Sequence, residues 1–573
     1  MLSPVPESLA PASAPTTVST TLVDALLRLG VTHAFGVMGG AIAPFFHAVA
    51  HSAITTLHLR HETGAGFAAI EASLATRRPV LVFTTAGPGL TNALTAMAAA
   101  RWEGAHVIFV SAATAAGNRG RVATQETAAG VLGTGAALPG ALHLATAIEH
   151  PAQLAPVVAQ LAIGLARPGG FVAHLALPID LQAATCPPIA HLPDRAALVP
   201  GPSAATIAEH AALLTSSPPV VWLGHGARHA APAIRRLVDR LGARVMCTPR
   251  AKGIVPEDHP RFLGVTGIGG HAHVDELLAA DRPAYTLVLG SRLGESSSFW
   301  SRDLTPREAF LHVDVDPTAF GVAYPAVRTL AAVSELGAYV DALLHVLDAA
   351  PTTALVPTPR RARTAPRPDG GVRPQLLLEE IQRVIVDGSD AWLMAESGNA
   401  FCWASHLLRY PQPGRFRMSP GFGSMGHAAT GVVGAAVARR GKAIALLGDG
   451  AMMMQNELHA AVQYRADALW IVLNDACYLM CAQGMRVMGW EPFSCELPRV
   501  DFVALARAVG ADGERVATEA EVGPALERAL AARGPWVLDV QLDPREVPPS
   551  GRRNQSLMQQ GFLPTPKSTG ATP

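Results

Sequence analysis

Three segments of similar size each alternate short apolar runs with longer helical patterns, and this alternation constrains the fold more than any other feature. The runs at 80–84, 106–111 and 443–447 contain no Asp, Glu, Lys or Arg. Runs of this kind are typical of strands buried on both faces, with helices crossing between them. The pattern therefore predicts an α/β protein with three doubly wound parallel-sheet domains.

Two proline-rich connectors divide the sequence. The first lies at 187–202, and the second, at 351–368, is also rich in Thr and Arg. Such segments are typical of linkers between domains. We expect an N-terminal domain over 18–185, a central domain over 200–350, a third domain over 370–548 and a C-terminal tail over 549–573. A chain of 573 residues is too long for one hydrophobic core, which agrees with several domains.

The charge balance excludes some classes of partner. Lys and Arg number 45 and Asp and Glu number 45, so nothing favours binding to nucleic acid or to an anionic membrane. The uncharged stretch 79–100 is long enough to raise the question of a membrane span, but Ala86-Gly87-Pro88-Gly89 interrupts it. We interpret it as a buried strand, a tight turn and a buried helix.

The N-terminal residues lack a basic region followed by an apolar stretch, so we expect no secretory signal. The six cysteines have no framework spacing, which is typical of a reducing cytoplasm. We expect Cys186, Cys247, Cys402 and Cys495 to be small buried hydrophobes.

The strongest chemical signal lies in the third domain. The apolar run 443–447 ends in Gly448-Asp449-Gly450, a helix is expected over 453–465, and a second run at 469–473 ends in Asn474-Asp475. In one βαβ unit, Asp449 and Asp475 would both project from the carboxyl ends of parallel strands, where ligands gather. Two hard oxygen ligands and a backbone carbonyl suit Mg²⁺ that holds a diphosphate.

This pattern resembles the signature of enzymes that use thiamine diphosphate, and the resemblance extends over nearly the whole chain. It is closest to the three-domain branch that contains acetolactate (acetohydroxyacid) synthase. The motifs that carry the resemblance are Phe35 to Ala41, Arg60-His61-Glu62, Thr85 to Asn92, Gln125-Glu126, Pro256 to Pro260, Asp314 to Pro317, Glu396 to Trp403 and Gly421 to Gly426. It implies a pyrimidine-binding first domain, a Rossmann-like central domain and a diphosphate-binding third domain.

The resemblance also implies roles for single residues. Glu62 would hydrogen-bond the pyrimidine ring of the cofactor and control its proton exchange, Gln125 would bind an intermediate, and Gly40 would line the substrate entrance. The metal ligands would be Asp449, Asp475 and the backbone carbonyl of Cys477. The cofactor contacts would be Gly398, Asn399, Ala400, Gly423, Met425, Gly448, Asp449, Gly450, Ala451, Asp475 and Met480.

The chain departs from the branch at several positions. Where the family has Asn-Asn, this chain has Asn474-Asp475, which adds a negative charge beside a diphosphate. A substrate-contacting arginine of the central domain is Ser296 here, and a tryptophan that shapes the acceptor pocket is Gly484. The resemblance therefore implies that the machinery for the donor is retained while recognition of the acceptor is altered.

These features favour a carboligase that decarboxylates a pyruvate-like 2-oxo acid and transfers the acyl carbanion to a second carbonyl compound. Proton donors are scarce, because the first glycine turn has Gly40 and Ala41, residues 111–117 contain no His pair, and Ala86 replaces a histidine of benzoylformate decarboxylases. A non-ligating 2-oxo acid decarboxylase and an aldehyde lyase remain as alternatives, as does a non-catalytic relative. The resemblance implies a homodimer or homotetramer, and it leaves open whether the central domain binds FAD.

Overall fold

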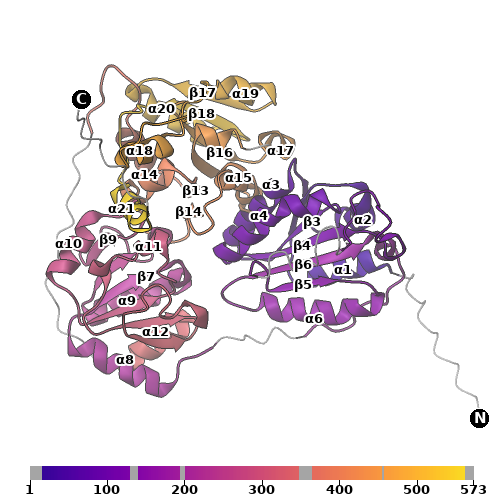
Figure 1. The fold of residues 1–573 in the computed structure, drawn as a ribbon, viewed down its shortest axis with the longest axis horizontal. Coiled ribbons are helices and arrows are strands. Elements are labelled where there is room, and N and C mark those ends of the chain that lie inside the picture. Colours follow the sequence, from indigo (N-terminus) through magenta and orange to yellow (C-terminus); the bar gives the residue numbers. More distant parts are fainter. Residues whose placement is uncertain (1–15, 129–139, 194–199, 348–363, 455–456, 562–573) are drawn as a thin grey trace, which may run out of the picture. The chain divides into compact units, whose positions relative to one another are not determined.

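The computed structural model describes residues 16–128, 140–193, 200–347, 364–454 and 457–561 (Figure 1). The chain divides into two compact units, residues 1–197 and 198–573. The described residues form three six-stranded sheets, one in the first unit and two in the second, and the strand pairs within each sheet are parallel. The predicted α/β class with three doubly wound sheets is confirmed.

The first unit is built around a sheet with the strand order β2-β1-β3-β4-β6-β5. Its strands are β1 (His33–Gly36), β2 (Thr55–His58), β3 (Val80–Thr84), β4 (His106–Ala113), β5 (Leu144–Ala147) and β6 (Phe171–Pro178). Its α-helices are α1 (Val18–Arg28), α2 (Ala43–Ala50), α3 (Glu62–Thr76), α4 (Pro88–Glu103), α6 (Leu154–Leu165) and α7 (Ile179–Gln182). Helices cover both faces of the sheet in Figure 1, and the central strands β3 and β4 are therefore almost fully buried.

The central sheet has the order β12-β11-β10-β7-β8-β9, which reverses direction between β7 and β10 as in Rossmann-like folds. Its strands are β7 (Val220–Leu223), β8 (Arg244–Cys247), β9 (Phe262–Val265), β10 (Tyr285–Leu289), β11 (Ala309–Asp314) and β12 (Thr329–Val333). Its α-helices are α8 (Ala204–Ser216), α9 (Ala231–Leu241), α10 (Ala272–Ala280), α11 (Glu295–Ser298) and α12 (Leu336–Val346).

The third sheet has the order β14-β13-β15-β16-β18-β17, the same connectivity as the first sheet. Its strands are β13 (Trp392–Ala395), β14 (Phe416–Met418), β15 (Ala443–Gly448), β16 (Ala468–Asn474), β17 (Asp512–Val516) and β18 (Trp536–Gln541). The accompanying α-helices are α13 (Pro374–Ile381), α14 (Asn399–Leu407), α15 (His427–Arg439), α16 (Asp449–Met452), α17 (Leu458–Gln463), α18 (Leu479–Val487), α19 (Phe502–Ala508), α20 (Glu519–Ala531) and α21 (Gly551–Gln559).

The helix predicted over 453–465 is shorter than expected. Within that range the structure has α17, and a separate short helix, α16, begins at Asp449 directly after β15. The apolar spacing hid this break, because Met453 and Met454 look like residues of a buried helical face yet are more than half exposed. Asp449 is consequently the first residue of a helix and does not lie in a turn that precedes one.

Other local predictions are confirmed. The stretch 79–100 forms β3, a turn and most of α4. Within the described ranges, no helix is both long enough and apolar enough to cross a bilayer. Cys186, Cys247, Cys402 and Cys495 are buried, and all six cysteines, which lie in described residues, are free thiols. After β7, a Cβ at Gly224 would lie 2.2 Å from the carbonyl oxygen of Gly290, so this glycine serves a close packing turn.

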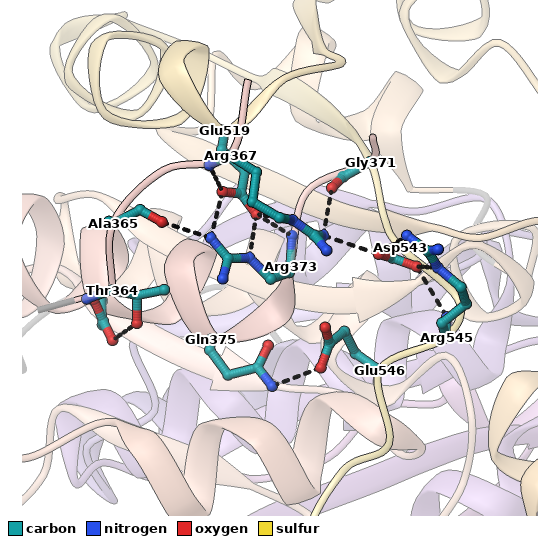
Figure 2. A network of polar contacts seen from close by, with 11 residues as sticks. Thr364, Ala365, Arg367, Gly371, Arg373, Gln375, Glu519, Asp543, Arg545 and Glu546 are labelled. Carbon is teal, nitrogen blue, oxygen red and sulfur yellow. Dashed lines mark hydrogen bonds and ion pairs between the residues drawn. The ribbon is translucent and has the colours of Figure 1, made fainter. Parts of the chain in front are cut away.

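A network of ion pairs connects the segment before α13 to Glu519 at the start of α20 and to Asp543, which follows β18 (Figure 2). Glu519 accepts hydrogen bonds from Arg373 Nε at 2.6 Å and Arg373 Nη2 at 2.7 Å, and from the backbone N–H of Arg367 at 2.6 Å. Asp543 accepts from Arg367 Nη2 and Arg545 Nη2, each at 2.9 Å. These charge-assisted bonds lower the pKa of Glu519 from 4.5 to about 2, chiefly through Arg373.

Candidate active site

Three neighbouring strands of the first sheet, β2, β1 and β3, have their carboxyl ends at the same edge of the sheet. Gly36, the last residue of β1, pairs with His58 of β2 and with Phe83 of β3. The segments that follow contain the first glycine turn, Glu62 and Thr85, respectively. Parallel strands in register therefore place three of the motifs found in the sequence at one edge of the sheet.

Glu62 is the first residue of α3, and its side chain is buried. Its Oε2 accepts a hydrogen bond from Asn92 Nδ2 of α4 at 3.1 Å. Helices α3 and α4 approach closely because Gly66 faces Ala96, and a Cβ at Gly66 would lie 2.2 Å from the Cβ of Ala96. Close helix packing thus brings the amide to the carboxylate. Asn92 belongs to a recognised motif, but no pattern in the sequence pairs it with Glu62.

Gln125 lies against the second glycine motif. Its side-chain carbonyl accepts a hydrogen bond from Thr85 Oγ1 at 3.2 Å. A Cβ at Gly87 would meet Gln125 atoms at 3.0 Å, and a Cβ at Gly39 would lie 2.6 Å from Thr85 Oγ1. Gln125 has a φ of +57°, a left-handed conformation that costs about 1 kcal/mol or more for a residue with a side chain. Gly40, next to Gly39, is exposed with open space around it.

In the third sheet, the two predicted metal-binding carboxylates come together. Gly448 of β15 pairs with Leu473 of β16, so Asp449 and Asp475 both follow adjacent strand ends. Burial raises the pKa of Asp475 to about 7, and the charge of Asp449 is the second cause. Burial also raises the pKa of Asp449, against the opposing effect of backbone N–H groups at Gly450, Ala476 and Cys477. Two buried, mutually repelling carboxylates are stabilised as anions by a divalent cation.

The chain turns sharply between Asp475 and Cys477, the two metal ligands expected after β16. Ala476 has a φ of +56°, and the backbone N–H of Cys477 donates to Asp475 Oδ1 at 3.1 Å. Tyr478 then lies over the start of α16, where a Cβ at Gly450 would lie 2.4 Å from its ring. The last glycine of the Gly-Asp-Gly triplet is therefore required by the ring of Tyr478, a contact that the sequence did not predict.

The remaining predicted diphosphate contacts lie at the start of α14. Gly398 has a φ of +123°, and open space surrounds the position where a Cβ would lie there and at Gly448. Asn399 Nδ2 donates to Gln483 Oε1 at 3.1 Å, whereas Asn399 Oδ1 is buried and has no hydrogen-bond partner among the described residues. An open glycine cradle with an unsatisfied amide oxygen fits a bound polar group. Ala400 and Ala451 are buried beside these positions, and Met480 is the second residue of α18.

Gly423 and Met425 belong to the loop that precedes α15. Gly423 has a φ of +71°, and the Met425 side chain is partly exposed. The buried carboxylate of Glu396 holds the start of α15, because its Oε2 accepts hydrogen bonds from the backbone N–H groups of Ala428 and Ala429 at 2.9 and 3.1 Å. Glu396 belongs to a recognised motif, and the structure gives it this positioning role.

The predicted residues thus form two groups, each described within its own unit. Glu62, Gln125 and Gly40 lie at the carboxyl edge of the first sheet, and the others lie at the carboxyl edge of the third. Among the described residues, no three His, Cys, Asp or Glu side chains are arranged to hold a metal ion.

Doubly wound parallel sheets with buried acids and glycine turns at their carboxyl edges are typical of α/β proteins that bind phosphorylated ligands. Comparison with known families is consistent with this class. Residues 16–132 match the N-terminal TPP binding domain of thiamine pyrophosphate enzymes, residues 207–343 their central domain and residues 396–540 their C-terminal TPP binding domain. The chain belongs to the thiamine pyrophosphate (thiamine diphosphate) enzymes, in the acetolactate synthase-like branch.

Curated relatives support the assignment to this branch. The chain is 32% identical over 513 residues to the "Putative acetolactate synthase large subunit IlvB2" of Mycobacterium tuberculosis, covering 85% of this chain and 90% of the relative. It is 27% identical to the acetolactate synthase isozyme 2 large subunit of Escherichia coli, covering 94% and 98%. The fold is similar to a solved structure, that of the thiamine diphosphate-dependent 4-hydroxybenzoylformate decarboxylase of Rhodococcus jostii RHA1. The TM-score is 0.80 at 23% identity, and the match covers 92% of this chain and 99% of that one. At this identity the likeness shows the fold alone.

Proposed function

We propose that this enzyme is a carboligase that decarboxylates a pyruvate-like 2-oxo acid and joins the acyl unit to a second carbonyl compound. The bond between C1 and C2 of the donor breaks and CO₂ leaves. C2 then forms a bond to the carbonyl carbon of the acceptor, whose oxygen takes up a proton. The similarity to acetolactate synthases and the residues at the first sheet edge support the proposal.

Thiamine diphosphate supplies the nucleophilic carbon and the electron sink for this reaction, and Mg²⁺ neutralises its diphosphate. Asp449, Asp475 and the backbone carbonyl of Cys477 would hold the metal ion. Gly398, Asn399 and Ala400 would contact the diphosphate mainly through backbone N–H groups. The unsatisfied Asn399 Oδ1 can accept a hydrogen bond from a donor group of a ligand. Glu62, buried at the start of α3 and oriented by Asn92, would exchange a proton with the aminopyrimidine.

The observation that carries the preference for ligation concerns proton donors at the first sheet edge. His58 and His61 lie there, but each already accepts a hydrogen bond: His58 Nε2 from the backbone N–H of Met38 at 3.0 Å, and His61 Nδ1 from that of Thr63 at 3.1 Å. Burial, reinforced by the charge of Arg60, lowers the pKa of His58. With its pKa lowered, His58 is a poor general acid, which favours attack on a second carbonyl compound over simple protonation.

The test is incubation of the holoenzyme with pyruvate, alone and with a panel of 2-oxo acids and aldehydes, followed by mass spectrometry of the products. We expect hydroxyketone or 2-hydroxy-2-acyl acid products together with CO₂. Free aldehyde as the sole organic product would refute ligation and establish a simple decarboxylase. Products formed by cleaving a hydroxyketone, without CO₂ release, would establish an aldehyde lyase.

We also infer a homodimer or homotetramer as the active form, on the strength of the family resemblance. Light scattering coupled to size exclusion measures the mass directly, against 59.7 kDa for one chain. A monomeric holoenzyme with full activity would refute this inference.

A further inference from the structure

The C-terminal helix α21 lies between the central domain and the third domain within the second unit (Figure 1). Arg552 forms an ion pair with the buried Asp275 of α10. Ser556 Oγ and Gln560 Nε2 donate to Glu295 Oε1 of α11 at 2.9 and 2.7 Å. Polar contacts along one side of α21 thus fix the helix against α10 and α11.

The next residue, Arg553, reaches the third domain. A Cβ at Gly484 of α18 would lie 3.8 Å from Arg553 Nη1. Arg553 also acts on Cys402 of α14. Burial raises the pKa of this thiol to about 12, and the positive charge of Arg553 partly offsets the rise. Arg553 therefore lies over α14 and α18, the two helices whose first turns contain the expected cofactor contacts Asn399 and Met480.

Arg553 is half-buried, and its guanidinium has no carboxylate partner among the described residues. The hydrogen bond printed for its side chain is to Asn554 Oδ1, at 3.4 Å. By contrast, the neighbouring Arg552 is paired with Asp275. A partly desolvated guanidinium without a counter-charge is suited to bind a carboxylate through two parallel N–H groups.

We propose that Arg553 binds the carboxylate of a 2-oxo acid substrate and so determines specificity, with Gly484 leaving room for it. This inference rests on the proposed function for the nature of the substrate.

The location favours a substrate carboxylate over the cofactor diphosphate. Gly484 is five residues after Leu479, the first residue of α18, which corresponds to about 7.5 Å along the helix axis. The expected metal ligands Asp475 and Cys477 precede that helix, so Gly484 lies more than one helical turn beyond them. The carboxylate can belong to the donor or to a 2-oxo acid acceptor, and the two cases differ in kinetics.

The experiment compares wild-type holoenzyme with Arg553→Met, Arg553→Lys and Gly484→Trp, and with Gln555→Met as a matched control on an exposed position of α21. With pyruvate as donor, the acceptor is either 2-oxobutyrate or propanal, and KM and kcat are measured for each substrate. Calorimetry with oxamate, a non-reacting 2-oxo acid mimic, measures binding without turnover. Circular dichroism verifies that each variant is folded.

For Arg553→Met we expect KM for the carboxylate-bearing substrate to rise about 10- to 100-fold with a small change in kcat, as for a lost charge-assisted hydrogen bond. Oxamate affinity should fall by a similar factor, Arg553→Lys should recover part of it, and Gly484→Trp should reproduce the loss by displacing the guanidinium. A rise in KM for 2-oxobutyrate alone shows that Arg553 binds the carboxylate of the acceptor. A rise in KM for pyruvate with both acceptors shows that it binds the carboxylate of the donor.

Unchanged KM values and unchanged oxamate affinity in folded Arg553→Met would overturn the proposal, as would equal effects in Gln555→Met. A wild-type protein that binds oxamate in an Arg553-dependent manner but releases no CO₂ from any 2-oxo acid would refute the proposed function and support the carboxylate site.

Discussion

Replacing Glu519 by Gln tests the ion-pair network of the third domain (Figure 2). The Glu519 side chain is 1% exposed and receives two hydrogen bonds from one guanidinium, that of Arg373. Lowering its pKa from 4.5 to about 2 corresponds to about 3 kcal/mol of folding free energy, at about 1.4 kcal/mol per unit. Gln keeps the shape and can still accept a backbone hydrogen bond, so we expect a loss of about 2–3 kcal/mol at pH 7.

The assay is hydrogen exchange of backbone amides in α13 and α20 as a function of urea, because local probes follow one domain of a multidomain chain. Glu527→Gln is the matched control on the same helix. Glu527 is 57% exposed and pairs with Arg383 at 3.0 Å, so its replacement should cost about 0–1 kcal/mol. Equal losses in the two variants would refute the role assigned to burial.

The network also predicts a pH dependence with a definite sign. Because the pKa of Glu519 is lowered in the folded state, its contribution is complete above pH 4.5 and is lost as the pH falls toward 2. The stability difference between wild type and Glu519→Gln should therefore shrink as the pH falls through this window. A difference that is the same at pH 6 and pH 3 would contradict the assignment.

Three further predictions concern the site. Glu62→Gln should lower kcat by about 10²- to 10⁴-fold while equilibrium dialysis shows retained cofactor, as expected for lost proton exchange; undiminished kcat would contradict its role. Asp449→Ala and Asp475→Ala should each abolish Mg²⁺-dependent retention of thiamine diphosphate, measured by dialysis with and without a chelator, and retention without divalent ion would contradict the metal site. Gly66→Val should destabilise the first unit by about 1–3 kcal/mol, because the new side chain would overlap Ala96. If the helix contact is the cause, the double variant with Ala96→Gly should be more stable than Gly66→Val in thermal unfolding.

The sequence predicted the strands well but missed a helix break. Buried parallel strands are encoded locally, in uncharged runs such as 80–84 and 443–447, and the structure has them within one or two residues. The break between α16 and α17 was missed because methionines fit an apolar helical face as well as an exposed loop. The predicted roles of Glu62, Gln125 and the third-domain residues stay predictions, although the structure brings Glu62 near Asn92 and Asp449 near Asp475.

By itself the sequence determined the three α/β sheets and the sheet edges at which the acids lie, because hydrophobic periodicity and glycine turns act over short stretches of chain. Tertiary structure alone decided that Asn92 meets Glu62, that the ring of Tyr478 covers Gly450, and that Arg553 lies against Gly484. These contacts join residues about 30 to 70 positions apart. Their formation depends on how whole helices pack, as when α21 is fixed by side chains of the central domain, and no local pattern encodes that packing.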